Sequence, residues 1–250
     1  MRLQRKRGFY ETYIKRIIDI ICSLFAIIFL SWLYISVALL VRIKLGSPII
    51  FKQPRPGMID PNTGQEKIFY IYKFRTMTDE KTADGRLKSD TERLTPFGKK
   101  LRATSLDEIP EAFNILRGEM SLIGPRPMLV RDMVFMSDRQ RMRHTAKPGL
   151  SGLAQINGRN AITWEKKLDW DLKYIENVSF WFDVKIILET AKQVFIRKNI
   201  TETTEETDIE LDYGDALLKA GRVSKEKYDA LQAYARLLLK SNTANTKIVS

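Results

Sequence analysis

The chain has 250 residues, of which 44% are apolar, so it is long enough to form a domain with its own core. Its 42 Lys and Arg residues outnumber 30 Asp and Glu, and the net charge of +12 indicates an anionic partner: nucleic acid, anionic lipid or a phosphorylated small molecule. The single cysteine, Cys22, excludes an intrachain disulfide.

An uncharged run lies near the N-terminus, from Ile20 to Val41. Its 22 residues are enough to cross a bilayer and too many for the apolar part of a secretory signal, and Arg42 and Lys44 follow where a cleavage site would need small residues. The run predicts a helix embedded in a membrane. A buried core helix is the alternative, although a helix of this length in a soluble protein usually has a polar face.

Cationic residues flank both ends of this run. Residues 1–56 contain ten Lys or Arg and two acids, and the positive-inside rule draws both ends to the cytoplasm. A hairpin that enters one leaflet and returns satisfies this rule, provided that the helix breaks midway; a single span stays open as the alternative. Ser31 and Ser36 could bend the helix through bonds to preceding carbonyl groups.

Two short strands are expected after the run, at 49–51 and 68–72, because both segments are rich in branched and aromatic residues. The segment between them contains Pro54, Pro56, Gly57, Pro61 and Gly64 and is predicted to be a loop. Alternation along the second strand places Lys73 and Arg75 on one face. Residues 78–95 are polar and are predicted to form a surface loop or an irregular helix.

Two adjacent acids, Asp107 and Glu108, stand in the middle of the chain. We expect Asp107 to cap a helix in which Pro110 takes the third position; a capping box of Ser105 and Glu108 would place this proline one residue too deep. A capped helix without further function is the simplest interpretation. The surrounding cations favour a phosphate substrate instead, and they are Lys99, Lys100, Arg102, Arg117 and Arg126.

The segment from Ala146 to Asn160 is predicted to form a turn, a strand and a second turn. Its polar residues Gln155, Asn157 and Arg159 are candidates for substrate contacts, and stabilisation of the turns by the amides is an equal alternative. His144, in a basic stretch, is expected to be a surface residue without a catalytic role.

The rest of the chain is predicted to be helical. Apolar spacing predicts amphipathic helices from Trp164 to Lys198, which suit either core packing or a membrane surface. An acidic linker follows over Thr201–Tyr213, and then a helical pair over Asp212–Ser241 in which Gly221 ends one helix and Ser224 caps the next. We therefore expect an α+β fold, mainly helical with short strands, divided into residues 1–48, 49–199 and 200–250.

Several motifs in order along the chain resemble the bacterial sugar transferase family, and in particular its small monotopic phosphoglycosyl transferases. The resemblance runs from about Lys15 to Lys198, and the motifs are Leu101-Arg102, Thr104 to Pro110, Asn114, Gly118 to Ser121, Gly124 to Pro127, Lys147 to Gly149 and Gln155 to Asn160. It implies a re-entrant membrane helix and a cytosolic catalytic domain with interfacial helices. The family usually breaks this helix at Ser-Pro, where the present chain has Ser31-Trp32.

The resemblance also implies a reaction: transfer of a phosphosugar from a UDP-sugar, with an acetamido sugar favoured, to polyprenol phosphate at the cytoplasmic face of a bacterial inner membrane. Asp107 would be the nucleophile and Glu108 would assist the acceptor, and both would bind Mg²⁺. Substrate contacts are expected from Lys73, Arg102, Arg126, Gln155, Asn157 and Arg159. A membrane-attached nucleotide-sugar hydrolase and a basic binding module are the alternatives.

The expected partners follow from the same resemblance and from the apolar N-terminal run. They are the UDP-sugar, polyprenol phosphate and the lipid bilayer, with a second copy of the chain or partner glycosyltransferases as candidates for protein contacts. No nucleic acid is expected, because the chain lacks a helix-turn-helix, an RNP motif and a zinc finger.

Overall fold

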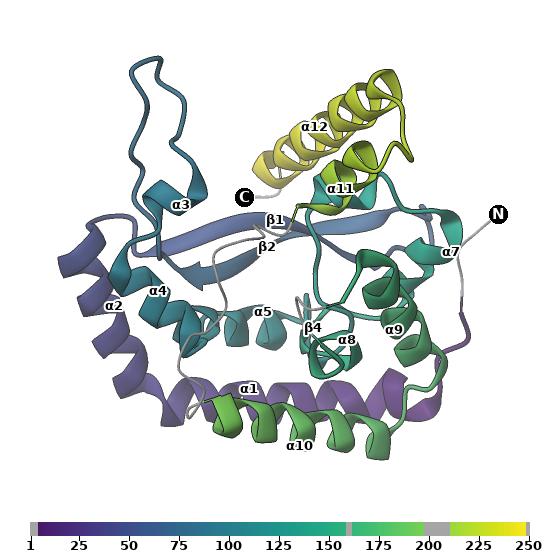
Figure 1. Ribbon diagram of the computed structural model, residues 1–250. Helices are drawn as coiled ribbons and strands as arrows, with labels where there is room; N and C mark the ends of the chain where they lie inside the picture. The colour runs from purple at the N-terminus through teal and green to yellow at the C-terminus, as the bar shows by residue number, and fades with distance from the viewer. Residues whose placement is uncertain (1–4, 159–161, 198–210, 249–250) are drawn as a thin grey trace. The chain divides into compact units, whose positions relative to one another are not determined.

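The structure is a computed structural model that describes residues 5–158, 162–197 and 211–248, and the expected α+β, mainly helical fold is confirmed (Figure 1). The chain forms two compact units. Unit 1 comprises residues 1–16, 54–69 and 119–250, and unit 2 comprises residues 17–53 and 70–118. Each unit is described separately below.

The helices and strands of the first half of the chain lead to the acidic pair. They are the π-helix η1 (Tyr10–Ile14), α1 (Lys15–Phe29), α2 (Ser31–Leu45), β1 (Ile50–Ile59), β2 (Glu66–Phe74), α3 (Asp90–Arg93), α4 (Pro96–Ala103), the 3₁₀ turn η2 (Leu106–Glu108) and α5 (Glu111–Arg117). The remaining elements belong to unit 1. They are β3 (Ser121–Ile123), α6 (Val130–Met133), α7 (Asp138–Arg141), η3 (Met142–Thr145), β4 (Gly149–Ser151), α8 (Leu153–Ile156), α9 (Trp164–Glu176), α10 (Phe180–Arg197), α11 (Tyr213–Lys219) and α12 (Lys225–Ile248).

The apolar N-terminal run is bent. The helices Tyr10–Phe29 and Ser31–Leu45 meet at an angle of 63°, so the predicted break is present at Leu30, next to Ser31. One turn later the Ser36 hydroxyl donates to the Trp32 carbonyl at 2.8 Å. Within the described residues, no single helix is long and apolar enough to cross a bilayer, whereas the two helices of this bent pair, taken together, have the necessary length and composition.

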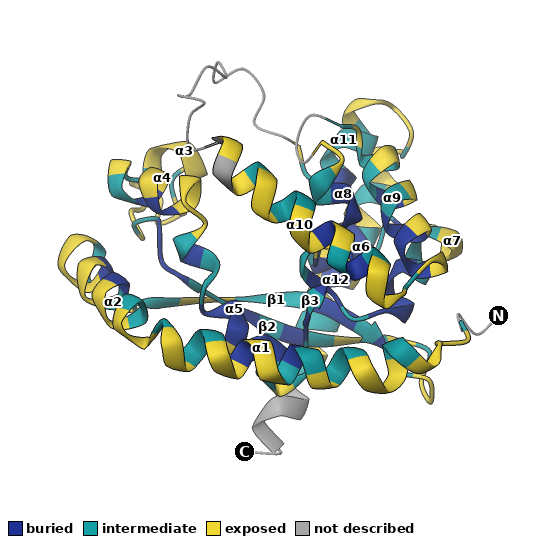
Figure 2. Cartoon of the chain, turned by 90° about the horizontal axis from the view of Figure 1, so that it is seen from below, coloured by how far each residue is buried: buried dark blue, intermediate teal, exposed yellow. Residues whose placement is uncertain are grey.

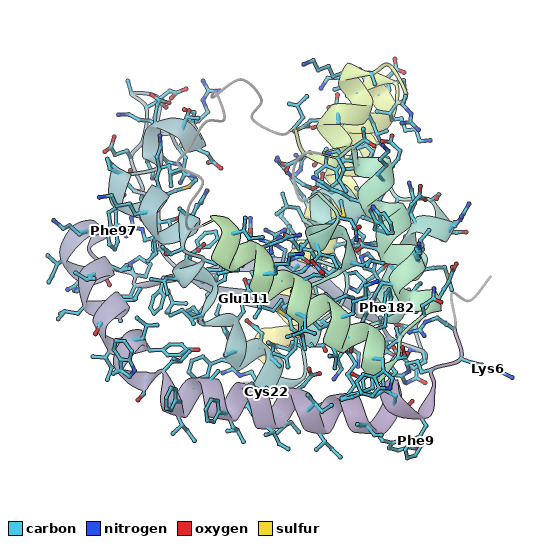
Figure 3. All side chains as sticks on the ribbon, turned by 60° about the horizontal axis from the view of Figure 1, so that its bottom comes forward. Lys6, Phe9, Cys22, Phe97, Glu111 and Phe182 are labelled. Atoms are coloured by element: carbon cyan, nitrogen blue, oxygen red, sulfur yellow. The ribbon has the colours of Figure 1, made fainter. Side chains whose placement is uncertain are left out.

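One side of the bent pair packs into unit 2 and the other is exposed. Val37 and Val41 of α2 form a buried cluster with Phe74 of β2 and Leu101 of α4, against which Phe97 also packs (Figure 3). The opposite side of α1 and α2 is exposed along much of its length (Figure 2). Its large apolar side chains are Ile17, Ile21, Phe25, Ile28, Phe29, Trp32, Ile35, Leu39 and Ile43.

The strands β1 and β2 are longer than expected. The loop predicted between the strands is confined to residues 60–65, which include Pro61 and Gly64. For Pro54 and Pro56 the loop prediction is wrong, because β1 continues through both prolines to Ile59. The two strands form a two-stranded sheet, and a strand at the edge of a sheet tolerates proline where the missing N–H removes no hydrogen bond. Gly57 permits close pairing, since a Cβ there would lie 2.8 Å from the Lys67 carbonyl oxygen.

The polar segment 78–95 combines both forms that were expected of it. Most of it has no regular structure, and the short helix α3 near its end is held by a capping box of Ser89 and Glu92. These residues belong to unit 2.

Unit 1 contains a second sheet, in which β3 and β4 pair in parallel with Ser121 opposite Gly149 and Ile123 opposite Ser151. After β4 the helical turn α8 replaces the simple turn that was expected. The backbone at Gly124, Gly149 and Gly152 is in direct contact: a Cβ on Gly149 would lie 2.1 Å from the Gly124 nitrogen, and one on Gly152 would lie 2.1 Å from the Gly124 oxygen. These glycines therefore serve close packing of backbone on backbone, which turn signals alone do not reveal.

The predicted C-terminal helices are confirmed. The segment that begins at Trp164 forms the two helices α9 and α10, and α11 and α12 form a helical hairpin (Figure 1). Gly221 adopts a positive φ of 66° between α11 and α12, and the Ser224 hydroxyl caps the second helix by accepting from the Lys227 nitrogen. Ala235 of α12 packs on Val130 and Met133. The predicted acidic linker lies mostly outside the described residues.

Candidate active site

The acidic pair lies on a tight turn rather than at a helix start. We expected Asp107 to cap a helix, and this is wrong: Leu106–Glu108 form the 3₁₀ turn η2, no side chain caps it, and α5 begins at Glu111 with Pro110 as its N-cap. Pro110 has no N–H and would clash with the preceding turn, so an α-helix cannot run continuously through this position. Ser105, at φ 55°, separates the turn from α4.

The strained backbone presents Asp107 in a buried position. A non-glycine residue at positive φ is uncommon and costs roughly 1–3 kcal/mol, and such residues concentrate at functional sites. Asp107 itself is only 6% exposed. Burial raises the pKa of Asp107, and the neighbouring Glu108 charge raises it further, whereas the charges of Lys73 and Arg102 act in the opposite direction. The structure thus brings four of the predicted residues together within unit 2.

Lys73 lies between two carboxylates. Its Nζ is 2.6 Å from Glu108 Oε1 and 3.2 Å from Glu111 Oε1. Glu111, on the first turn of α5, is 1% exposed and was not among the predicted site residues (Figure 3). Its position three residues after Glu108 indicates a role in the site only weakly, because acids are common in the first turns of helices for reasons of stability alone.

Asn114 sets the position of Lys73 relative to α5. This fully buried amide donates to the Tyr70 carbonyl at 2.7 Å and accepts from the Tyr72 nitrogen at 3.0 Å, so it continues the hydrogen bonding of β2. Because Lys73 follows Tyr72 directly, its side chain is carried by a strand that is bonded to α5, the helix on which Glu111 lies. Asn114 occurs in the matched motifs, but its spacing predicted no such role.

The two other cations of this segment have different surroundings. Arg102 of α4 is exposed, and the Thr76 hydroxyl accepts from its Nε at 3.1 Å, which orients the guanidinium near Asp107. Arg75 is buried and donates to the carbonyls of Leu45, Ser47 and Met77. Arg75 therefore holds the turn after α2 in place, whereas Arg102 is available to a ligand.

Arg126 belongs to unit 1 and is exposed on the loop between two prolines. Its carbonyl accepts from Arg143 Nη2 at 2.6 Å, and the next carbonyl, that of Pro127, accepts from Arg55 Nη1 at 3.0 Å. Arg143 in turn is 2% exposed and pairs with the buried Asp171. Two arginines thus fix the backbone on which Arg126 stands, and the sequence motifs gave no indication of either contact.

The downstream polar residues are also in unit 1. Gln155 Nε2 donates to the Leu150 carbonyl at 3.0 Å, and Asn157 Nδ2 donates to the Leu153 carbonyl at 2.8 Å. Both amide groups therefore stabilise the local backbone, as in the alternative considered above. Among the described residues, no donor bonds to the buried Gln155 Oε1, so this oxygen can accept from a further donor. Arg159 lies outside the described residues.

His144 is not the surface residue that was expected. It is 4% exposed, and its Nδ1 lies 3.0 Å from Glu66 Oε1, while Arg143 Nη1 lies 3.2 Å from Nε2. Burial lowers the pKa of His144 to about 4, against the effect of the hydrogen bond to Glu66. The histidine is therefore neutral at pH 7, and the network favours the tautomer that donates from Nδ1.

The donor set of the acidic turn suits one hard cation. Among the described residues, no group of three His, Cys, Asp or Glu side chains is arranged to hold a metal ion. Asp107 and Glu108 supply two carboxylates, and Mg²⁺ is commonly bound by one or two carboxylates together with substrate phosphates and water. A cation beside Asp107 would also oppose the two effects that raise the pKa of this group. The residues present therefore fit Mg²⁺ when a diphosphate supplies the remaining oxygens.

Known proteins resemble this chain over most of its length. The model of the family "Bacterial sugar transferase" matches residues 10–197. The "Uncharacterized sugar transferase EpsL" of Bacillus subtilis (strain 168) is 43% identical over 194 residues, which are 78% of this chain and 93% of that protein.

Two relatives with more specific names are longer proteins. The "UDP-glucose:undecaprenyl-phosphate glucose-1-phosphate transferase" of Klebsiella pneumoniae is 40% identical over 197 residues, 74% of this chain and 41% of that protein. The "UDP-N-acetylgalactosamine-undecaprenyl-phosphate N-acetylgalactosaminephosphotransferase" of Aeromonas hydrophila is 36% identical over 191 residues, 73% of this chain and 44% of that protein.

The matched region includes the acidic turn, Lys73, Arg102 and the loop of Arg126, and it ends before α11 and α12. The family match covers well over half of the chain, and the identity to EpsL extends over nearly the whole of that relative. The chain is therefore a member of the bacterial sugar transferase family.

Proposed function

We propose that this protein transfers a phosphosugar from a UDP-sugar to polyprenol phosphate and releases UMP. The observation that carries the proposal is the buried Asp107 on its strained turn, beside Glu108, Lys73 and Arg102. The two longer relatives described above are named as transferases of this kind, one for glucose 1-phosphate and one for N-acetylgalactosamine phosphate.

In the first step, a carboxylate oxygen of Asp107 attacks the phosphorus that bears the sugar. The bond from this phosphorus to the oxygen that bridges the two phosphates breaks, and UMP leaves with the bridging oxygen. The product is an acyl phosphate that links Asp107 to the sugar. Asp107 must be ionised to attack, and the positive charges of Lys73 and Arg102 favour that form.

In the second step, a phosphate oxygen of the polyprenol phosphate attacks the same phosphorus. The acyl phosphate bond breaks, the Asp107 carboxylate is regenerated, and the sugar leaves on a lipid-linked diphosphate. Glu108 is adjacent in the sequence and held by Lys73, and we assign to it the orientation of the acceptor and the removal of its proton where one is present. Two adjacent carboxylates form a coupled pair, so their roles are separated only by experiment.

Two exposed arginines have the chemistry of phosphate ligands. Arg102 belongs to unit 2 and Arg126 to unit 1, and in each the planar fork of donors matches phosphate oxygens. Mg²⁺, held by Asp107 and Glu108, would neutralise charge on the phosphate oxygens when it is bound. An acetamido sugar is our preferred substrate, and Gln155, Asn157 and Arg159 are the candidates for contacts to the sugar or the nucleotide.

The acceptor is a lipid, and the apolar surfaces of the chain suit a position at a membrane. The exposed side of α1 and α2 is apolar, and the exposed Trp181 and Leu188 of α10 are 77% and 64% accessible. We propose that the bent pair α1–α2 enters one leaflet from the cytoplasmic face and returns, and that α10 lies at the headgroups. Cations before and after the bent pair would then remain on one side.

The decisive experiment measures UMP release by the purified full-length protein in detergent with Mg²⁺. A panel of UDP-sugars is tested with and without polyprenol phosphate, and we expect multiple turnovers for one sugar only when the lipid is present. Asp107→Asn should abolish release. Release at an equal rate without the lipid would instead identify a nucleotide-sugar hydrolase.

The covalent intermediate is tested separately under single-turnover conditions without the lipid. We expect one equivalent of UMP and a phosphosugar adduct on the tryptic peptide of residues 103–117, which contains Asp107. Glu80→Gln is the matched control, because it neutralises an exposed acid that is paired with Lys88 far from the acidic turn in sequence. UMP release without an adduct in the wild-type protein would contradict the covalent route.

A further inference from the structure

Glu111 is a third carboxylate beside the acidic pair, and the reaction described above gives it no role. It is the first residue of α5 and is 1% exposed. Its Oε1 lies 3.2 Å from Lys73 Nζ, the same ammonium group that lies 2.6 Å from Glu108 Oε1. One lysine therefore faces two carboxylates that lie three residues apart in the chain.

The two carboxylates differ in exposure. The side chain of Glu108 is 17% exposed and that of Glu111 is 2% exposed. A buried carboxylate is strongly destabilised when it loses its cation, whereas a partly exposed one can exchange its partner for water or a ligand. Glu111 is thus the permanent partner of Lys73, and Glu108 is the partner that an incoming phosphate oxygen can replace.

The strand that carries Lys73 is held to the same helix. Asn114, one turn after Glu111 on α5, bonds to the backbone of Tyr70 and Tyr72. The strand that leads into Lys73 is thereby held by Asn114 and the Lys73 ammonium group by Glu111, and both contacts come from α5. This arrangement leaves the lysine little freedom to follow a departing phosphate.

We propose that Glu111 is a positioning residue for the transfer reaction: it holds the Lys73 ammonium beside Glu108 and Asp107 while phosphate groups enter and leave. The inference rests on the proposed function, because that function assigns Asp107 and Glu108 their roles. In this proposal Glu111 acts on the reaction through the Lys73 ammonium group and makes no contact with the substrate.

The first test compares Glu111→Gln with the control Glu80→Gln in the lipid-dependent assay. Glutamine preserves the shape of the side chain but cannot hold an ammonium group by charge. We expect kcat to fall between about tenfold and a hundredfold, with the KM for the UDP-sugar within about twofold, because misplaced catalytic groups affect the reacting complex most. Glu80→Gln should leave both parameters unchanged.

Single-turnover measurements without the lipid separate positioning from a loss of folded protein. The amplitude of UMP release counts the competent molecules, and the rate constant reports the first chemical step. We expect Glu111→Gln to keep the amplitude of Glu80→Gln and to lower the rate constant by about tenfold to a hundredfold. A lower amplitude with an unchanged rate constant would overturn the proposal.

A second test needs no turnover. In thermal unfolding, Lys73→Met should lower the Tm because it removes a cation that lies 3.2 Å from the buried Glu111, and adding Glu111→Gln to that variant should restore most of the loss. Adding Glu108→Gln should restore less, since Glu108 is more exposed. If the effects of Lys73→Met and Glu111→Gln simply add, the two residues are not coupled and the proposal is overturned.

The two tests also separate this proposal from the function on which it rests. Wild-type protein that releases no UMP in the presence of the lipid overturns the proposed function, and the positioning role with it. Wild-type turnover combined with additive Tm effects, or with normal kinetics in Glu111→Gln, overturns the positioning role alone.

Discussion

Arg143 and Asp171 form a buried ion pair in unit 1. Arg143 Nη2 lies 2.7 Å from Asp171 Oδ2, Nε donates to the same oxygen at 2.9 Å, and the two side chains are 2% and 4% exposed. The same Nη2 donates to the carbonyl of Arg126. Charge deep inside the unit thereby supports the loop that presents an exposed arginine.

We expect Asp171→Asn to destabilise the protein, because the Arg143 charge stays buried after its partner is neutralised. Breaking a buried pair in this way costs about 3–5 kcal/mol, and the change is measured by thermal or urea unfolding. Asp229→Asn is the control, since it breaks an exposed pair with Lys225 and should change the stability by less than about 1 kcal/mol. Equal effects of the two variants would contradict a buried, paired Arg143.

A second prediction concerns pH and stability. Burial lowers the pKa of His144 to about 4, and burial raises the pKa of Glu66 while hydrogen bonds from His144 and Arg141 together lower it to about 2. Unfolded histidine titrates near 6.5, so between about pH 6.5 and 4 the unfolded chain binds more protons at this position and the folded protein loses stability as the pH falls. The lowered pKa of Glu66 also makes the folded protein lose stability as the pH falls, but only below about pH 4.5.

The test is the Tm of wild-type protein and of His144→Gln between pH 7 and 4.5. We expect the variant to be less stable at pH 7 and to show a flatter decrease in Tm toward pH 4.5, because glutamine does not titrate. Contributions from the acids that do not contact His144 are common to both proteins and cancel in the difference. Parallel curves would show that His144 is not held neutral by its burial.

A third prediction concerns the acidic limb of the first chemical step. Burial and the Glu108 charge raise the pKa of Asp107, and the single-turnover rate of UMP release should decline on acidification as this carboxylate becomes protonated. Lys73→Met removes a charge that opposes this effect and should move the limb to higher pH. Glu108→Gln should reduce the rate and move the limb to lower pH.

Lys73→Met and Glu108→Gln are expected to move the acidic limb in opposite directions, so one comparison can contradict the prediction. Arg117→Gln is a suitable control in the same unit, because Arg117 contacts the Tyr72 hydroxyl and ring and is not among the causes of the Asp107 shift. A limb that moves in the same direction in Lys73→Met and Glu108→Gln would contradict the assignment of Asp107 as the titrating nucleophile.

A fourth prediction concerns the bent pair α1–α2. Cys22 is the only cysteine, so a Cys22→Ser protein can carry one new cysteine at Gly8 or at Ser47, on either side of the apolar run. If the pair enters and leaves the membrane on the cytoplasmic side, a membrane-impermeant maleimide will label both positions in inverted vesicles and neither in spheroplasts. Labelling of one position in each preparation would identify a single span.

Much of the fold and part of the site followed from local patterns in the sequence. The apolar run and its break, the C-terminal helices with Gly221 and Ser224, and the acidic pair within a basic frame depend on residues a few positions apart. Local sequence patterns predicted the wrong secondary structure where packing against other parts of the chain determines it. Pro110 was expected inside a helix and instead precedes α5 as its N-cap, and Pro54 and Pro56 were expected in a loop and instead lie in a strand.

By itself, the sequence determined which residues can carry the chemistry: the motifs identify the family, and the types and spacing of Asp107, Glu108 and Arg102 indicate phosphate chemistry. Only the tertiary structure decided how they are held. Glu111 meets Lys73, Arg143 meets Asp171 28 residues away, and His144 meets Glu66 78 residues away. Such pairs leave no periodic signal, because the free energy of a buried charge depends on what the fold places against it.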